Sequence, residues 1–165
     1  MKVLVTADTH IPTKGKQLPS NFIEACKTAD LIIHAGDWKS MEVYRTLSKY
    51  AEVKGVYGNV DSDEIKEQFP ALQIVEVIGY KIGIVHGHGE RKTTEKRAIE
   101  AFDEKEVDVI IFGHSHIPLI RYFKKVLVMN PGSPTDKRKL PYYSYGTIEI
   151  DKEIKAELIF YSNKT

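Results

Sequence analysis

The chain has 165 residues, of which 42% are hydrophobic, and its 24 Lys and Arg residues nearly balance 23 Asp and Glu residues. This length is typical of one domain with a substantial core, so we interpret residues 1–165 as a single domain. The formal net charge of +1 gives no strong nucleic-acid signature, because binding to a polyanion favours an excess of basic residues. The single cysteine, Cys26, excludes an internal disulfide, and no apolar run is long enough to span a membrane. We therefore expect a cytoplasmic protein.

Short apolar segments alternate with helical patterns over the first two thirds of the chain. The segments are apolar at nearly every position, which is typical of strands buried on both faces of a sheet. We expect such strands at residues 3–5, 31–33, 53–57, 82–85 and 107–112. Apolar residues at helical spacing predict helices around residues 22–29, 43–50 and 98–102. Ser20 and Ser40 are the expected N-caps of the first two helices.

The pattern changes near residue 70. Residues 72–78 and 80–85 are joined through Gly79 with no room for a helix, which predicts a hairpin. Apolar and charged residues alternate between 148 and 160, as they do in antiparallel strands. We therefore expect a largely parallel sheet and a second, mostly antiparallel one, packed face to face. With helices on the outer faces, these two mixed β-sheets form a four-layer α/β/β/α sandwich.

An Asp, Asn or His residue follows each of the five buried strands. In open α/β sheets, the carboxyl ends of the strands are where ligands bind. The residues at these ends are Asp8 and His10, Asp37, Asn59 and Asp61, His86 and His88, and His114 and His116. Oxygen and imidazole donors without clustered cysteine suit manganese, iron, zinc, cobalt or nickel. Two such ions, about 3.5–4 Å apart, would hold a hydroxide between them and position it for in-line attack on phosphorus.

The order of these motifs resembles that of the calcineurin-like metallophosphoesterases. The compact length is similar to the small bacterial and archaeal phosphodiesterase branch, which also contains the retromer small subunit. The motifs are Asp8-x-His10, Gly36-Asp37, Gly58-Asn59-x-Asp61, His86-Gly87-His88, Gly113-His114-x-His116 and Asn130-Pro131-Gly132-Ser133. The resemblance implies the double-sheet sandwich and a two-metal site. It places Asp8, His10 and His116 on the first ion, Asn59, His86 and His114 on the second, and Asp37 as the bridge.

The resemblance implies a metal-dependent phosphodiesterase that hydrolyses a small phosphodiester substrate through a metal-bridging hydroxide at a dinuclear site. We take two Mn²⁺ ions as the first expectation, although ligand chemistry leaves Ni²⁺, Zn²⁺ and Fe²⁺ open. One alternative is a scaffold that binds partner proteins, as the retromer small subunit does. Another is a phosphomonoesterase with the same site. The complete ligand set favours an enzyme, since a scaffold has no need for seven costly polar groups.

One position departs from the family pattern. Many members have a histidine directly after the asparagine of the third motif, and here that residue is Val60, which cannot donate a proton. His88 is the candidate to replace it, so we assign catalytic roles to Asn59 and His88. Loss of an acid matters less for an aryl leaving group than for an alkoxide.

Three further features have structural interpretations. Asp61, with Glu64 three residues later, resembles the reciprocal N-cap of a helix. His34 lies inside an apolar strand, which indicates a packed core histidine. The basic residues 137–139 indicate an exposed loop face, with steering of an anionic substrate as the alternative.

Overall fold

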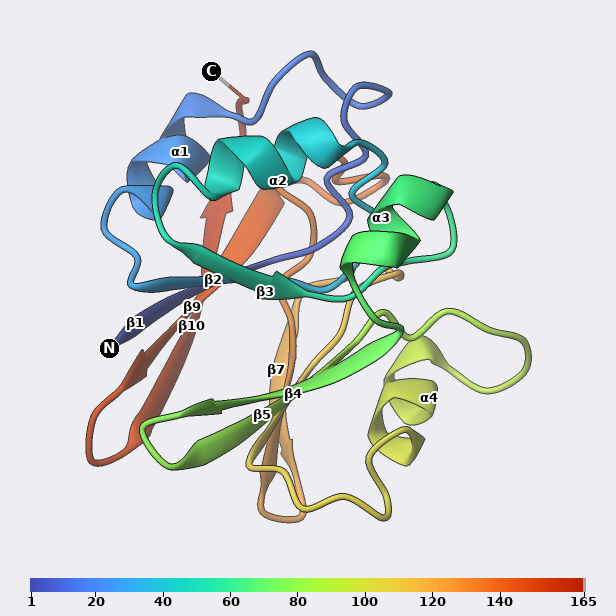
Figure 1. The fold of residues 1–165 in the computed structure, drawn as a ribbon, viewed down its shortest axis with the longest axis vertical. Helices are drawn as coiled ribbons and strands as arrows, with labels where there is room; N and C mark the ends of the chain where they lie inside the picture. Colours follow the sequence, from blue (N-terminus) through green and yellow to red (C-terminus); the bar gives the residue numbers. More distant parts are fainter. Residues whose placement is uncertain (165) are drawn as a thin grey trace.

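The structure, a computed structural model, describes residues 1–164. Across these residues two five-stranded sheets pack face to face, with helices on their outer sides (Figure 1). Sheet A consists of β1 (Lys2–Thr6), β2 (Leu31–His34), β3 (Glu52–Gly55), β9 (Tyr143–Ile150) and β10 (Ile154–Tyr161). Sheet B consists of β4 (Leu72–Val77), β5 (Tyr80–Val85), β6 (Val109–Ile111), β7 (Leu119–Phe123) and β8 (Val126–Asn130). The helices are α1 (Ser20–Cys26), α2 (Met41–Leu47), α3 (Asp63–Gln68) and α4 (Thr94–Glu100).

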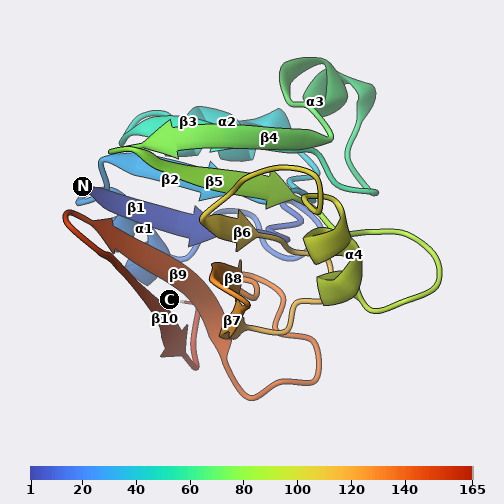
Figure 2. The same cartoon turned by 90° about the horizontal axis from the view of Figure 1, so that it is seen from below.

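Both sheets are mixed. Sheet A has the order β10-β9-β1-β2-β3, with β1, β2 and β3 parallel and the tail strands β9 and β10 antiparallel. Sheet B has the order β4-β5-β6-β8-β7, with β5, β6 and β8 parallel and β4 and β7 antiparallel at its edges. The parallel strands of sheet B therefore lie at its centre between two antiparallel edge strands, whereas those of sheet A run from its centre to the β3 edge, with the antiparallel strands β9 and β10 on the other side (Figure 2).

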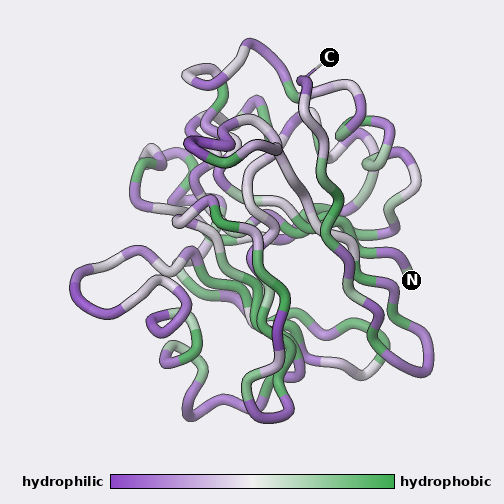
Figure 3. The backbone as a smooth tube through the Cα atoms, turned by 180° about the vertical axis from the view of Figure 1, so that it is seen from behind, coloured by the Kyte–Doolittle hydropathy of each residue, from purple (hydrophilic) through white to green (hydrophobic). Residues whose placement is uncertain are grey.

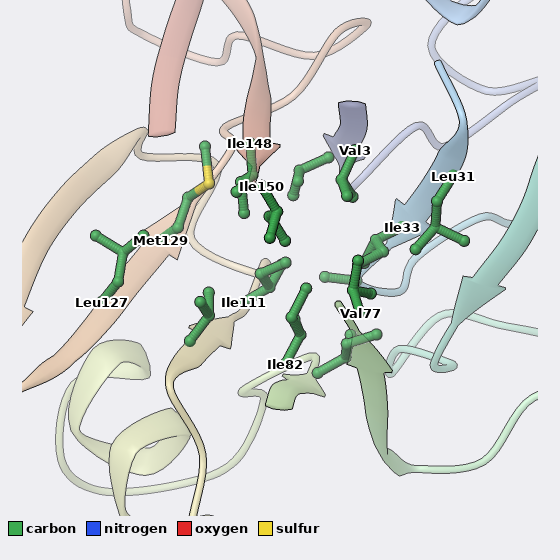
Figure 4. Close-up of a cluster of buried hydrophobic side chains, with 14 of the residues drawn as sticks. Val3, Leu31, Ile33, Val77, Ile82, Ile111, Leu127, Met129, Ile148 and Ile150 are labelled. Atoms are coloured by element: carbon green, nitrogen blue, oxygen red, sulfur yellow. The ribbon is translucent and has the colours of Figure 1, made fainter. Parts of the chain in front are cut away.

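Three apolar clusters separate the four layers. Alternation along β1 sends Val3 and Val5 into the cluster between the sheets, which also contains Ile82 and Ile111 of sheet B (Figure 4). Leu4 points the other way, into the cluster beneath α1 and α2. A third cluster lies between sheet B and α4. The apolar segments follow the strands, and hydrophilic residues gather on the surrounding loops (Figure 3). The four-layer sandwich is confirmed.

Two details of the expected fold are wrong. The second sheet is not mostly antiparallel, because β5 and β6 join sheet B through parallel pairing whereas β9 and β10 return to sheet A. Local alternation cannot determine which sheet a strand joins, since that depends on long-range pairing. Ser20 is the first residue of α1, and Pro19 occupies the cap position.

Other details are confirmed. Ser40 caps α2, and its side chain accepts a hydrogen bond from the Glu42 amide. The hairpin of β4 and β5 turns at Ile78 and Gly79, which both have positive φ angles, 50° and 81°. Among the described residues, no helix is sufficiently long and apolar to cross a membrane.

Candidate metal centre

The strand-end residues from both sheets meet at one edge of the sandwich. Asp8, His10, Asp37 and Asn59 follow strands of sheet A. His86, His114 and His116 follow strands of sheet B. Each polar residue therefore follows the carboxyl end of a strand that pairs in parallel, as the sequence predicts.

Six of these side chains form two groups that could each hold a metal ion. The first group is Asp8, His10 and His116, and the second is Asp37, His86 and His114; within each group the ligand atoms lie within 4.8 Å of one another. The groups adjoin, since His10 Nε2 lies 3.6 Å from Asp37 Oδ2. Asn59 belongs to the second group, because its Oδ1 lies 3.1 Å from both His86 Nε2 and His114 Nδ1. The structure thus brings all seven residues together.

The hydrogen bonds of two histidines show which ring atom faces each group. His116 Nδ1 donates to the Asp136 carbonyl at 2.8 Å, and His86 Nδ1 donates to the Ala35 carbonyl at 2.7 Å. In a neutral ring, the opposite nitrogen, Nε2, then carries a lone pair. Such lone pairs face acceptors, because His86 Nε2 lies 3.2 Å from Asp37 Oδ2. In the metal-free protein a proton on His86 relieves this repulsion: burial disfavours the charged ring, but the facing carboxylates of Asp37 and Asp8 raise its pKa. A divalent ion can take the place of that proton, so this donor set fits divalent ions.

Asp8 gives an independent indication of a cation. Its side chain is completely buried, and neither carboxylate oxygen has a hydrogen-bond partner among the described residues. Burial raises the pKa of Asp8 to about 7. A buried carboxylate without donors is costly unless a positive charge compensates it, and a metal ion supplies that charge.

The charge states of the other groups also suit metal binding. Burial, followed by the charge of His86, lowers the pKa of His114 to about 4. Burial likewise lowers the pKa of His116 to about 4, so both rings are neutral ligands at neutral pH. Burial acts to raise the pKa of Asp37, but the hydrogen bond and charge of His86 hold it at about 2. Asp37 is therefore ionised.

The ligand segments have a strained backbone. Five candidate ligands have φ angles between 45° and 67°, which non-glycine residues rarely adopt: Asp8, His10, Asp37, His114 and His116. Such conformations persist where surrounding interactions hold them, and they cluster at functional sites. Two sets of hydrogen bonds hold these backbone segments in place.

The first set centres on Asp61. Its buried carboxylate accepts hydrogen bonds from the backbone amides of Asp37, Gly58 and Lys39 at 2.9, 2.7 and 2.7 Å. The expectation that Asp61 caps a helix is wrong, because the cap position of α3 is Ser62 and Glu64 pairs with Arg45 instead. Asp61 instead joins the segment carrying Asp37 to the segment carrying Asn59. A capping box and this longer-range contact share one local sequence pattern, so spacing alone could not separate them.

The second set comes from the Asn130-Pro131-Gly132-Ser133 motif. Asn130 Nδ2 donates to the Gly113 carbonyl and to Ser115 Oγ, both at 3.0 Å. Ser133 Oγ donates to the Asp8 carbonyl at 2.8 Å. The motif therefore holds ligand segments from both sheets, a role that its position after the last strand-end histidine did not reveal.

The remaining candidates lie around the second group. His88 is exposed, and its ring centroid is 5.5 Å from that of His86 and 6.3 Å from that of His114. Val60 is 42% exposed, and its amide donates to Asp37 Oδ1 at 3.1 Å. Sequence reasoning missed Arg97 on α4, which donates to the Gly87 carbonyl at 2.8 Å and fixes the loop between His86 and His88. A lone helical arginine carries no sequence signal for that role.

The chain belongs to the calcineurin-like phosphoesterase superfamily, whose domain it matches over residues 1–153. It is 34% identical to a probable metallophosphoesterase of Methanothermobacter thermautotrophicus over 96% of this chain and 92% of that protein. Among solved structures, the zinc complex of Entamoeba histolytica Vps29 aligns with a TM-score of 0.76 at 25% identity, covering 97% and 99% of the two chains. A structure described as a novel archaeal phosphodiesterase aligns with a TM-score of 0.73 at 25% identity, covering 96% and 100%.

Proposed function

We propose that the protein is a metal-dependent phosphodiesterase that hydrolyses a small phosphodiester by in-line attack of hydroxide at a dinuclear site. The observation that carries this proposal is the convergence of seven donors into two adjoining groups around a buried Asp8 carboxylate that has no hydrogen-bond partner within residues 1–164. The similarity to an archaeal phosphodiesterase supports the diester assignment. A reducing, cytoplasmic location is part of the proposal, since Cys26 is a free, buried thiol.

The proposed ligand sets follow the two groups. Asp8, His10 and His116 would hold one divalent ion, and Asn59, His86 and His114 would hold the other. Asp37 would serve both ions, because its carboxylate lies against both His10 and His86. Bound divalent ions supply positive charge that lowers the pKa of water and stabilises charge on phosphate oxygens. We take Mn²⁺ as the first expectation, with Ni²⁺, Zn²⁺ and Fe²⁺ as alternatives.

The surrounding residues have proposed roles toward the substrate. The Asn59 carboxamide can donate a hydrogen bond from Nδ2 to a phosphoryl oxygen while its Oδ1 faces the ligand histidines. His88 lies beside the second group, where its protonated ring can give a proton to the leaving oxygen; partial burial and the charge of His86 lower its pKa, so this role should strengthen as pH falls below neutral. Arg138 is exposed two residues beyond Asp136, whose carbonyl holds His116, so we propose that it attracts the phosphate anion.

Hydrolysis of bis(p-nitrophenyl) phosphate tests the proposal. Metal-stripped protein should be inactive, and Mn²⁺, Ni²⁺ or Zn²⁺, added back singly, should restore turnover. The Asp37→Ala and His116→Ala variants should show only the background rate, whereas Asp103→Ala, at an exposed position on a distant turn, should match the parent. Equal turnover by Asp37→Ala would contradict the proposal. Faster turnover of p-nitrophenyl phosphate than of the diester would identify a phosphomonoesterase instead.

Leaving-group dependence tests the role of His88. The His88→Ala variant should lose about 10²–10⁴-fold in kcat/KM for a diester with an alkoxide leaving group. The loss should be under about tenfold for p-nitrophenolate, which leaves without protonation. Glu90→Ala, an exposed neighbour on the same loop, serves as the control. Equal losses for both substrates would indicate that His88 supports a ligand rather than the leaving group.

A protein-binding scaffold is the second candidate, and an apolar surface favours it. Ile117, Tyr142 and Phe160 are 58%, 50% and 51% exposed and line one hollow with Pro118, Leu140 and Pro141. Exposed apolar patches of this kind mark interaction sites. Absence of turnover with every metal, in protein shown to bind two ions, would favour this candidate.

A further inference from the structure

His34 is a buried histidine outside both ligand groups. It ends β2 three residues before Asp37, and its side chain is wholly buried. Its ring stacks on the Trp38 indole, with centroids 3.7 Å apart and an interplanar angle of 11°. The indole is fixed in turn, because Trp38 Nε1 donates to the Val56 carbonyl at 2.8 Å. The expectation of a packed histidine is confirmed. Packing alone does not explain which partners the two ring nitrogens, Nδ1 and Nε2, bind in this apolar environment.

Both ring nitrogens of His34 are used. The Gly36 amide donates to Nδ1 at 3.2 Å, so that atom carries the lone pair. In the neutral ring Nε2 then carries the proton and donates to Thr9 Oγ1 at 3.1 Å. The Thr9 hydroxyl donates onward to the Trp38 carbonyl at 3.4 Å. Burial lowers the pKa of His34 well below its usual range, which is consistent with this neutral form.

These two bonds reach the two ligand segments of sheet A. Thr9 lies between Asp8 and His10, and Gly36 immediately precedes Asp37. The segments also pair directly, since the Asp8 amide donates to the Gly36 carbonyl at 2.9 Å. Backbone pairing fixes their spacing along the edge of the sheet, whereas the rigid imidazole fixes how far Thr9 stands from Gly36.

We propose that His34 is a positioning residue that sets the separation between the Asp8–His10 segment and Asp37, and hence between the two metal ions. This inference rests on the proposed dinuclear centre. The strained φ angles of Asp8, His10 and Asp37 explain the need for such a spacer, because each of these conformations persists only where its neighbours hold it.

Two substitutions separate the two bonds of the ring. In His34→Asn the carboxamide oxygen falls near the position of Nδ1, so the bond from Gly36 is kept and the bond to Thr9 is lost. In His34→Gln the carboxamide nitrogen reaches the position of Nε2, so the bond to Thr9 is kept and the bond from Gly36 is lost. We expect His34→Asn to weaken binding of the ion on Asp8, His10 and His116 by about tenfold or more, and His34→Gln to weaken binding of the ion on Asn59, His86 and His114 instead.

Calorimetric titration of the metal-free full chain with Mn²⁺ resolves the two affinities. Electron paramagnetic resonance of the loaded protein adds a second measure, because coupling between the two Mn²⁺ ions depends on their separation. Thr9→Val should reproduce the effect of His34→Asn, and the two substitutions together should cost no more than either alone. Val43→Ala removes packing from the same buried cluster as Trp38 and should leave both affinities unchanged.

Three results would overturn the inference, and they are distinguishable. If both His34 variants bind two ions with the parental affinities and coupling, His34 has no positioning role. If the His34 variants and Val43→Ala all weaken the binding of both ions, and to the same extent, His34 acts only through stability. If the parent protein itself binds no ions, the proposed dinuclear centre fails together with the inference.

Discussion

The Asp8→Asn variant is expected to be more stable than the parent above pH 7 when no metal is bound, and to lose most of the stabilisation that metal binding gives the parent. The Asp8 carboxylate is buried without a hydrogen-bond partner among the described residues, and burial raises its pKa to about 7. Asparagine is isosteric, uncharged, and tolerates the φ angle of 55° at this position as aspartate does. The difference in unfolding free energy at pH 8 should be on the order of a few kcal/mol.

Protonation of Asp8 explains why the parent should be the less stable protein at high pH. In the unfolded chain Asp8 ionises near its ordinary pKa of 3.8, whereas in the folded protein it stays protonated up to about pH 7. Folding therefore takes up a proton at Asp8 between these values, so the contribution of Asp8 to stability is greatest below about pH 4 and falls as pH rises to about 7. The Asp8→Asn variant should lack this fall.

Thermal unfolding between pH 4 and 8, with chelator or with Mn²⁺, measures both parts of the prediction. Two ions, each at 100 times its dissociation constant, should stabilise the parent by about 5 kcal/mol, or roughly 10–20 °C in Tm. The variant should gain far less. Asp103→Asn, at an exposed position, should follow the parent throughout. A metal-free Asp8→Asn protein that melts below the parent at pH 8 would contradict the prediction.

Loss of the Asp61 carboxylate is the second large effect that we expect. The Asp61→Ala change leaves the amides of Asp37, Gly58 and Lys39 without their acceptor. It should lower the free energy of unfolding by about 3 kcal/mol or more, because each buried donor left unsatisfied costs about 1–3 kcal/mol. The Tm should fall by roughly 6–12 °C. Mn²⁺ affinity should fall as well, since the segment bearing Asp37 loses its support.

Metal titration separates this role from helix capping. A lost N-cap would cost about 0.5–2 kcal/mol and would leave metal affinity unchanged. Asp63→Ala, in the first turn of α3 and exposed, is the matched control. Unchanged Mn²⁺ binding by Asp61→Ala, with a loss no larger than that of the control, would show that Asp61 does not hold the site.

Much of the fold was predictable because its central strands are apolar on both faces. The segments at β1, β2, β5 and β6 were recognised for this reason, and so was the hairpin at Gly79. The partition of strands between sheets was not predictable. The alternation in β9 and β10 shows that they are strands, but the pairing of β9 with β1 joins segments almost the whole chain length apart.

The candidate ligands were predictable because strand ends place their side chains at one edge. The residues that hold them were harder to find. Asp61 has the local spacing of a helix cap, and His34 occupies an ordinary core position in a strand, so the short-range pattern does not reveal the contacts that either residue makes with the ligand segments. The bond from His116 to Asp136 uses a backbone carbonyl, which any residue type would supply. Sequence therefore identifies the groups that would touch a metal better than the groups that support them.

The candidate centre also affects how the two sheets come apart. Each ligand group combines residues from sheet A with residues from sheet B, so any ion bound there would cross-link the two sheets at this edge. The two sheets cannot separate at that edge while the ion is bound, and unfolding of either sheet requires that the ion be released. Metal loading should therefore merge the local openings of the two sheets into one cooperative event, visible as slower amide exchange in β1 and β6 together.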